Sequence, residues 1–477
     1  MLLVTTQAFR TPNRVVVIGG GPGGYEAALV AAQLGAEVTV VDSDGIGGSA
    51  VVTDCVPSKT LIATAELMTE VEGAGELGVL IGDDGVAVDL ARVNARVKRL
   101  ALAQSADISR RLERDGVRIV HGRGRLEAGI GRRRVIVEQL DQNGAEPVVL
   151  EADAVLVATG ASPRTLPTAE PDGERILTWE QVYDLTEVPS RMIVVGSGVT
   201  GAEFASAYNA LGIDVVLVSS RDQVLPGEDA DAAKVLEDVL VRRGMTVLSR
   251  SRMESVSREG DVVKVELTDG RVVEGSHALL ALGSVPNTRD IGLEESGVQV
   301  DEGGFIRVDG VSRTTAPGIY AAGDCTGVLM LASVAGMQGR IAMWHFLGDA
   351  VSPLDLRTVS SNVFTAPEIA TVGYSQREIE AGDVVAEIVM LPLAGNPRAK
   401  MQGVSEGFVK IFAAPGTGTV VGGVVVGPRA SELIHPVSLA VATSMSVDQL
   451  AQAFTVYPSN SGSIAEAARR LHHRRSH

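Results

Sequence analysis

The sequence predicts an α/β protein with two Rossmann-like dinucleotide-binding domains followed by a C-terminal α+β domain. Two glycine-rich turns carry this prediction, because each directly follows an apolar run and precedes an alanine-containing helical stretch. A third observation is the change of pattern near residue 351, after which the glycine motifs disappear and strand-like runs at residues 408–412 and 420–426 alternate with a helical stretch at residues 431–443.

The first glycine-rich turn follows the apolar run at residues 15–18 and leads into a helical stretch at residues 25–34. Gly19, Gly21 and Gly24 have the spacing G-x-G-x-x-G, which lets the turn close and the backbone approach a pyrophosphate. The amino end of the helix then offers N–H groups and a positive dipole end to the phosphates. A glycine-rich turn can also serve only to reverse the chain, but strand, turn and helix in this order favour nucleotide binding.

The same arrangement occurs a second time, where the apolar run at residues 192–195 leads into Gly196, Gly198 and Gly201. Two motifs of this kind in one chain imply two bound dinucleotides. They also imply two nucleotide-binding domains.

The strand that follows each glycine-rich unit ends in a different chemical group. After the first glycine motif this strand ends in Asp42, a carboxylate that can accept hydrogen bonds from ribose hydroxyls. After the second glycine motif the corresponding strand ends in Ser219, Ser220 and Arg221. These hydroxyls and the guanidinium can bind a 2′-phosphate, which a carboxylate would repel. Arg221 can equally be a solvated turn residue, and the sequence leaves both interpretations open.

Further strands return to the nucleotide-bearing sheets at residues 154–157, 278–282 and 318–322. The third leads into Gly323 and Asp324, which places a carboxylate at the carboxyl edge of a sheet, where ligands of open α/β sheets bind. Asp324 is therefore a candidate for holding a cofactor hydroxyl.

Composition limits the classes of function. The net charge of -17 argues against nucleic acid as a partner and favours a small-molecule substrate. No apolar run approaches the roughly 18 residues needed to span a bilayer, so no integral membrane contact is expected. Only two cysteines, Cys55 and Cys325, occur in 477 residues, which suits a reducing compartment; we expect a cytoplasmic protein without a metal site.

Taken together, the motifs resemble those of the pyridine nucleotide-disulfide oxidoreductase family, and of lipoamide dehydrogenase in particular, over nearly the whole chain. Besides the two glycine motifs, the matching segments are Gly47-Gly48, Pro57-Ser58-Lys59, Ala158-Thr159-Gly160, Pro286-Asn287-Thr288, Gly323-Asp324, Phe364-Thr365-Ala366-Pro367-Glu368-Ile369 and Asn396-Pro397-Arg398-Ala399.

The resemblance implies an FAD-binding domain at residues 10–160 and 285–350, an NAD(P)-binding domain at 161–284, a dimerisation domain at 351–470 and a flexible tail at 471–477. It implies a homodimer whose active sites contain residues of both chains. The FAD-binding residues it implies are Gly19, Gly21, Gly24, Asp42, Gly48, Ser49, Lys59, Ala158, Thr159, Gly160, Gly323, Asp324, Leu331 and Ala332. Those for NADPH or NADH are Gly196, Gly198, Gly201, Glu203, Ser219, Ser220, Arg221 and Gly283.

Two devices of the family's disulfide chemistry are missing. The family has two cysteines separated by four residues, and the corresponding pair here is Ala50 and Cys55, so an internal disulfide cannot form. In the C-terminal domain, Tyr457 replaces the family's acid-base histidine and Gly462 replaces the glutamate that orients it.

The resemblance places Lys59 and Glu203 as a pair near the flavin. A cation there would stabilise negative charge on the reduced ring, although the pair can also serve only as a salt bridge between domains. Cys55 is either a reactive thiolate beside the flavin or an inert small residue. Tyr457 is either a hydrogen-bond donor to the substrate or a space-filling side chain. Cys55 and Tyr457, like Lys59 and Glu203, are candidates for catalysis.

Without a dithiol, the electron acceptor must react at the flavin itself. A planar quinone fits this requirement, and the sequence also resembles lipoamide-dehydrogenase-like NAD(P)H quinone reductases of actinobacterial type. The sequence therefore predicts an FAD-dependent NAD(P)H:quinone oxidoreductase without lipoamide reductase activity. The alternatives are a soluble pyridine nucleotide transhydrogenase and a non-catalytic flavoprotein that acts as a redox sensor.

Overall fold

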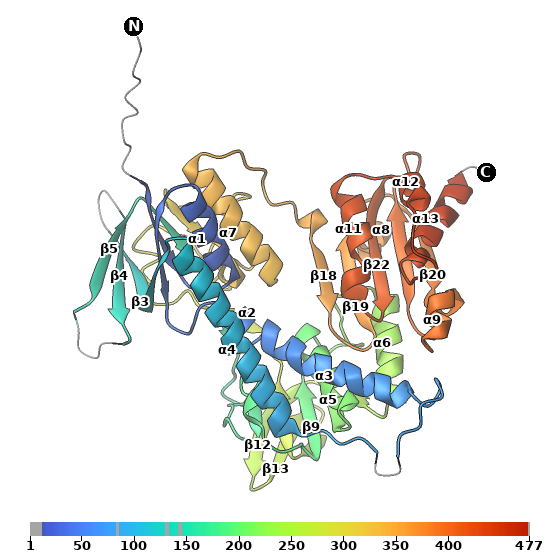
Figure 1. The fold of residues 1–477 in the computed structure, drawn as a ribbon. Helices are drawn as coiled ribbons and strands as arrows, with labels where there is room; N and C mark the ends of the chain where they lie inside the picture. Colours follow the sequence, from blue (N-terminus) through green and yellow to red (C-terminus); the bar gives the residue numbers. More distant parts are fainter. Residues whose placement is uncertain (1–11, 83–84, 129–132, 142–145, 476–477) are drawn as a thin grey trace. The chain divides into compact units, whose positions relative to one another are not determined.

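The computed structural model describes residues 12–82, 85–128, 133–141 and 146–475 (Figure 1). The chain divides into two compact units, each built from three segments. The first unit contains Met1–Val56, Arg99–Ser162 and Ser284–Leu354, and the second contains Pro57–Lys98, Pro163–Gly283 and Asp355–His477. Residues 57–98 thus group with the second unit, whereas the sequence analysis counts them in the FAD-binding domain.

The first unit contains a seven-stranded sheet with the strand order β17-β6-β1-β2-β3-β4-β5. Its four strand pairs from β17 to β3 are parallel, and the pairs β3–β4 and β4–β5 are antiparallel. The strands are β1 (Arg14–Ile18), β2 (Glu37–Asp42), β3 (Arg118–Glu127), β4 (Arg133–Gln139), β5 (Val148–Ala152), β6 (Ala154–Val157) and β17 (Ile319–Ala321).

Helices α1 (Pro22–Gln33) and α7 (Ala332–Leu347) pack against each other in this unit. Small residues make the close approach possible, since a Cβ atom on Gly339 would lie 2.0 Å from the carbonyl oxygen of Gly23. This unit also contains helix α2 (Gly48–Val52) and the part of the long helix α4 (Leu90–Arg114) from Arg99 onward. The buried strand residues form apolar clusters on both faces of the sheet, as expected for parallel strands.

The second unit contains a five-stranded, fully parallel sheet with the order β11-β10-β9-β15-β8. Its strands are β8 (Ile176–Thr178), β9 (Arg191–Val195), β10 (Asp214–Val218), β11 (Thr246–Leu248) and β15 (His277–Leu280), with helices α5 (Val199–Ala210) and α6 (Ala230–Arg242). A three-stranded antiparallel sheet accompanies it, formed by β12 (Met253–Glu259), β13 (Val262–Leu267) and β14 (Val272–Gly275).

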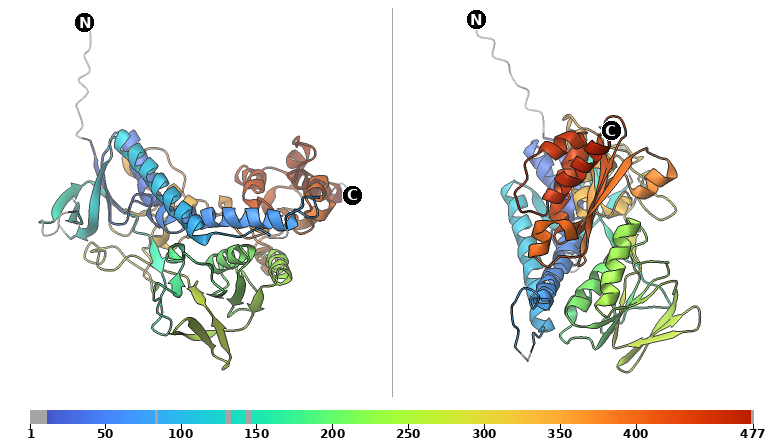
Figure 2. Two further views of the ribbon diagram at one scale, coloured as in Figure 1. Left: turned by 60° about the horizontal axis from the view of Figure 1, so that its bottom comes forward. Right: turned by 90° about the vertical axis from the view of Figure 1, so that its right-hand side faces the viewer.

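The C-terminal part of the second unit is an antiparallel sheet with the order β18-β19-β22-β21-β20. Helices α11 (His435–Ala442) and α13 (Gly462–Arg475) contact this sheet. The right-hand view of Figure 2 shows this part of the chain in orange and red. The strands are β18 (Ser360–Val363), β19 (Glu368–Gly373), β20 (Glu387–Pro392), β21 (Phe408–Ala413) and β22 (Val420–Gly427). The helices are α8 (Gln376–Ala381), α9 (Pro397–Met401), α10 (Ala430–Leu433), α11 (His435–Ala442), α12 (Val447–Gln452) and α13 (Gly462–Arg475).

One apolar core joins the parts of the second unit. It contains residues of α3 (Cys55–Gly73), α5 and α6 together with Phe408, Phe412, Val424 and Val426 of the C-terminal sheet. The nucleotide-binding sheet and the C-terminal sheet therefore share buried side chains.

The predicted fold class, an α/β protein with two Rossmann-like sheets and a C-terminal α+β domain, is confirmed. Two details differ from the sequence analysis. The helical stretch expected at residues 431–443 is divided at Ile434 into α10 and α11. The segment expected to be a flexible tail begins inside α13, where Leu471 is fully buried against the C-terminal sheet.

Candidate functional site

The first glycine turn has the contacts that its spacing predicts. Gly19 has a φ of 103°, and a Cβ atom there would lie 2.2 Å from the carbonyl oxygen of Ala158. A Cβ atom on Gly24 would lie 1.9 Å from the carbonyl oxygen of Gly19, so both positions require glycine. By contrast, the only described atom near such a position on Gly21 is the Cα atom of Gly48, at 3.9 Å. The turn is thus closed on its protein side and open where a pyrophosphate would approach.

Asp42 joins the glycine turn to the segment that follows β2. The residue is 8% exposed, and its carboxylate accepts the N–H groups of Gly20 at 2.7 Å, Asp44 at 3.0 Å and Gly45 at 2.6 Å. A carboxylate has about four lone-pair sites, so capacity for a hydroxyl remains. Asp42 therefore has a structural role that the sequence analysis did not anticipate, in addition to the predicted one.

Thr159 and Asn287 bind each other in the loops that follow β6 and β16 (Ser284–Pro286). The Thr159 hydroxyl donates to the Asn287 carbonyl at 2.7 Å, and the Asn287 amide donates to the Thr159 carbonyl at 3.0 Å. The Thr159 side chain thus helps to hold the loop after β6 against the loop after β16.

Asp324 lies three residues after the end of β17, half-buried at the predicted edge of the sheet. Burial and the nearby Asp54 raise the pKa of the Asp324 carboxyl to about 6. In the part of the chain that the structure describes, no group donates a hydrogen bond to this carboxylate, so its acceptors are available to a cofactor hydroxyl. An unpartnered half-buried carboxylate fits the predicted role.

Gln338 on α7 is a residue of this site that the sequence analysis missed. It is 2% exposed, accepts the N–H of Gly323 at 2.8 Å and donates to the hydroxyl of Thr326 at 3.3 Å. It thereby fixes the turn that carries Asp324. Its signal in the sequence is a lone amide within an otherwise apolar stretch of the helix. The predicted site residues Leu331 and Ala332 are the N-cap and the first residue of the same helix.

The second glycine turn repeats the geometry of the first. Gly196 has a φ of 112°, and a Cβ atom there would lie 2.2 Å from the carbonyl oxygen of Ala281. A Cβ atom on Gly201 would lie 1.8 Å from the carbonyl oxygen of Gly196, whereas Gly198 has open space around it. Gly283, also a predicted site residue, has a φ of 85° and open space around it. The residues of both turns therefore fit a dinucleotide.

The end of β10 differs from the expectation in one respect. Ser219 is fully buried, with its hydroxyl 2.6 Å from that of Ser197 and accepting the N–H of Arg221 at 3.1 Å. Ser220 and Arg221 are exposed, and within the described residues the Arg221 guanidinium forms no ion pair. Ser219 thus shapes the turn, and Ser220 and Arg221 are the groups left to bind a phosphate.

Lys59 and Glu203 form the predicted pair. The ammonium of Lys59, on α3, lies 2.8 Å from the carboxylate of Glu203, on α5. Glu203 is 5% exposed and its second oxygen accepts the N–H of Phe364 at 2.9 Å, while the Lys59 ammonium lies 4.8 Å from the centre of the Phe364 ring. The Glu203 carboxylate is therefore buried but compensated by two donors.

Neither cysteine takes part in a disulfide. Cys325 is fully buried, and burial raises the pKa of its thiol to about 11, so it is an inert packing residue at neutral pH. Cys55 is half-buried at the first position of α3, and Ala50 lies in α2. One sulfur alone is thus present at the redox position of the family.

Tyr457 lies in the loop between α12 and α13 with 83% of its surface exposed. Phe454 and Val456 in the same loop are also strongly exposed, with Val456 at 77%. Gly462 begins α13. Within the described residues, the exposed Tyr457 side chain therefore does not contribute to the packing of the second unit.

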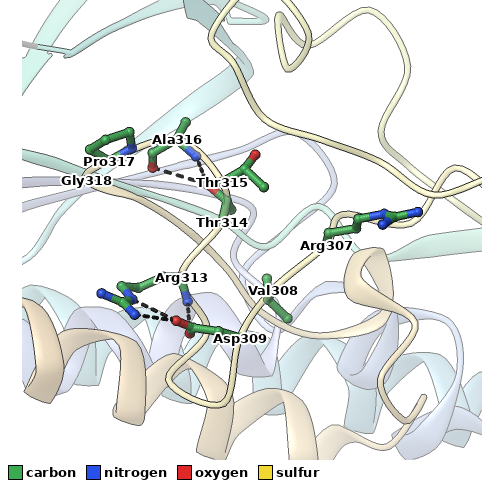
Figure 3. Close-up of a pocket in the computed structure, with 9 residues that line it drawn as sticks. All are labelled: Arg307, Val308, Asp309, Arg313, Thr314, Thr315, Ala316, Pro317 and Gly318. Carbon is green, nitrogen blue, oxygen red and sulfur yellow. Dashed lines mark hydrogen bonds and ion pairs between the residues drawn. The ribbon is translucent and has the colours of Figure 1, made fainter.

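The first unit also has a hollow of about 480 Å³ that contains no predicted site residue (Figure 3). Its wall is formed by residues 307–309 and 313–318. The charged pair in it is satisfied internally, since Arg313 binds Asp309 at 2.7 Å. The described residues contain no cluster of three or more histidine, cysteine, aspartate or glutamate side chains suited to a metal ion. None of the helices in the described ranges combines the length and apolarity needed to cross a bilayer.

Comparison with known proteins agrees with this geometry. Residues 13–339 match the family model "Pyridine nucleotide-disulphide oxidoreductase", and residues 359–468 match the dimerisation domain of the same family. The chain is 58% identical to an NAD(P)H dehydrogenase (quinone) of Mycobacterium tuberculosis, covering 96% of this chain and 94% of the relative. It is 32% identical to the dihydrolipoyl dehydrogenase of Bacillus subtilis, covering 96% and 98%.

A solved structure, LpdA from Mycobacterium tuberculosis, superimposes with a TM-score of 0.92 at 57% identity, covering 96% of this chain and 99% of that one. These findings confirm the predicted family, the oxidoreductase class and the cofactors FAD and NAD(P)H.

Proposed function

We propose, from the premise that this chain belongs to the pyridine nucleotide-disulphide oxidoreductase family, that it transfers electrons from NADPH or NADH through FAD to quinones. The observation that carries the proposal is a chain that forms both nucleotide turns and the Lys59–Glu203 pair but has a single sulfur, Cys55, at the redox position. A 58% identical relative named NAD(P)H dehydrogenase (quinone) supports the choice of acceptor.

The proposed organisation assigns FAD to residues 10–160 and 285–350, and NAD(P)H to residues 161–284. FAD supplies the hydride acceptor and the electron donor of the reaction. Gly19, Gly21, Gly24 and Asp324 would hold its pyrophosphate and a hydroxyl, and Lys59 would stabilise negative charge on the ring. The nicotinamide cofactor would bind Gly196, Gly198, Gly201, Ser220 and Arg221.

We further propose that residues 351–470 form a homodimer. The match to a family dimerisation domain and the exposed side chains of Phe454, Val456 and Tyr457 support this. In the dimer, Tyr457 of one protomer would lie at the flavin of the other. Because a phenol O–H donates hydrogen bonds readily, Tyr457 would act there as a hydrogen-bond donor. The small number of cysteines supports a cytoplasmic location.

The function is tested with the purified, FAD-containing dimer and a panel of electron acceptors. We expect NADPH and NADH oxidation to depend on an added quinone such as menadione. Rapid reduction of a second nicotinamide instead of menadione would identify a transhydrogenase. Loss of NAD(P)H oxidation with every acceptor would identify a non-catalytic flavoprotein.

Binding of FAD to the apoprotein is expected to become stronger as the pH rises from about 4 to 6. The Asp324 carboxyl of the apoprotein, with its pKa near 6, is protonated in the lower part of this range. A cofactor hydroxyl that donates to the carboxylate lowers this pKa, so binding releases a proton and is favoured by higher pH. Calorimetry in two buffers of different ionisation enthalpy measures the proton release. An Asp324→Asn variant with the same pH dependence as the wild type would assign the effect to another group.

Tyr457→Phe keeps the aromatic ring and removes the donor. We expect the turnover of menadione to fall about tenfold or more, because a hydrogen bond that forms as negative charge develops on the quinone oxygen is lost. Anaerobic flavin reduction by NADPH should keep its rate, since that half-reaction does not use the phenol. If menadione turnover is unaltered in this variant, Tyr457 only fills space.

A further inference from the structure

The second unit contains a buried ammonium group that the proposed electron transfer does not use. Lys410, on β21, has a side chain only 1% exposed. Its Nζ atom lies 2.9 and 2.8 Å from the two carboxylate oxygens of Asp229, 2.7 Å from Asp231 and 2.8 Å from the side-chain oxygen of Gln376. An ammonium has three N–H donors, so these contacts saturate it. Lysine is almost never fully buried without such partners. Lys410 and its three partners, which we call the Lys410 cluster, therefore form a closed ion-pair cluster and not a ligand site.

The Lys410 cluster connects the C-terminal sheet to the nucleotide-binding sheet. Lys410 and Gln376 belong to β21 and α8, whereas Asp229 is the N-cap of α6 and Asp231 lies in its first turn. A second cation makes a parallel connection, since Arg377 of α8 donates to the carbonyl oxygen of Pro226 at 3.0 Å. Two cationic side chains from one region thus hold residues 226–231.

The other side of the same segment is attached to the second glycine turn. Leu225 is 1% exposed, and its N–H donates to the carbonyl oxygen of Ser197, inside the turn, at 2.9 Å. The N–H of Val224 donates to the carboxylate of Glu237 on α6 at 3.0 Å. Residues 222–229 therefore run from the end of β10, next to Arg221, between the glycine turn and the two cations.

We propose that Lys410 is a positioning residue for the pyridine-nucleotide site: together with Arg377, it holds residues 222–231 so that Arg221 and the glycine turn keep the geometry that binds NADPH. The proposal rests on the proposed function of residues 196–201 and 220–221. The C-terminal part of the chain would then contribute to the affinity for the nucleotide, although neither Lys410 nor Arg377 belongs to the nucleotide-binding sheet.

The test is Lys410→Met in the FAD-containing dimer, because methionine keeps most of the volume and removes the charge. Rapid mixing under anaerobic conditions measures flavin reduction over a range of NADPH concentrations. We expect the half-saturating NADPH concentration to rise about tenfold or more, because the segment is no longer held in place. Reoxidation of the dithionite-reduced variant by menadione, which does not involve NADPH, should proceed at the wild-type rate.

Arg377→Ala gives a second test that does not disturb a buried charge, since the Arg377 side chain is exposed. We expect a rise of about fivefold in the half-saturating NADPH concentration, the effect of one lost hydrogen bond. The matched control is Arg398→Ala, because Arg398 is also an exposed arginine on a helix of the C-terminal part, α9, and this variant should bind NADPH as the wild type does.

If the Lys410 cluster has only a structural role, both variants should have a lower melting temperature and an unchanged half-saturating NADPH concentration. This result would overturn the proposal. If Lys410→Met does not fold, Arg377→Ala decides the question alone. Failure of the proposed function itself would look different, because the wild-type protein would then not be reduced by NADPH or would not be reoxidised by menadione.

Discussion

Replacing Lys59 by methionine is expected to lower the turnover of menadione by about 100-fold, the usual cost of removing one preorganised group that stabilises developing charge. The Lys59 ammonium lies 2.8 Å from the Glu203 carboxylate and is the positive member of the pair. Steady-state assays with saturating NADPH and varied menadione measure the loss in kcat. The variant should still purify with FAD, because the glycine turn and Asp324 are unchanged.

The matched control for this variant is Lys264→Met on β13. Lys264 has nearly the same side-chain exposure as Lys59, 28% against 31%, and pairs with Glu259 at 2.6 Å. We expect this control to keep full activity. If Lys59→Met also keeps it, the pair with Glu203 only ties α3 to α5, which is the structural alternative.

Replacing Arg221 by alanine should raise the KM for NADPH by about 10- to 100-fold and leave the KM for NADH nearly unchanged. A charge-assisted hydrogen bond between a guanidinium and a phosphate contributes about 1.5–3 kcal/mol, and NADH has no 2′-phosphate to lose. The ratio of the two KM values, from initial rates with saturating menadione, reports the effect directly.

Arg191→Ala serves as the control, because Arg191 lies at the opposite, amino end of β9 and binds Asp214 at 2.7 Å. Its KM values should match those of the wild type. An unchanged KM ratio in Arg221→Ala would mean that Arg221 is a solvated turn residue and that the end of β10 does not recognise the 2′-phosphate.

The sequence predicts the parts of the site that depend on local backbone geometry. Gly19 and Gly196 have the positive φ values that their spacing requires, and Gly24 and Gly201 allow the close approaches expected of them. Such features depend on residues only a few positions apart, so a short motif contains all the information. The Lys59–Glu203 pair is different, because its prediction came from the family resemblance and not from spacing.

Contacts between distant segments could not be predicted in this way. The sequence predicts that Ser219 binds a phosphate, but its hydroxyl is buried against that of Ser197, 22 residues earlier. One partner of Gln338, Gly323, lies 15 residues away, and one partner of Lys410, Asp229, lies 181 residues away. A pattern of residue types specifies that such polar side chains are unusual in apolar surroundings, but only the packed structure identifies what they bind.

The most direct test of the central claim, electron transfer without a dithiol relay, is the Cys55→Ala variant assayed with menadione and with lipoamide. We expect NADPH-dependent menadione reduction to continue in this variant at a rate close to that of the wild type, and neither protein should reduce lipoamide. Robust lipoamide reduction by the wild type, lost together with menadione reduction in Cys55→Ala, would show instead that the electrons pass through this thiol.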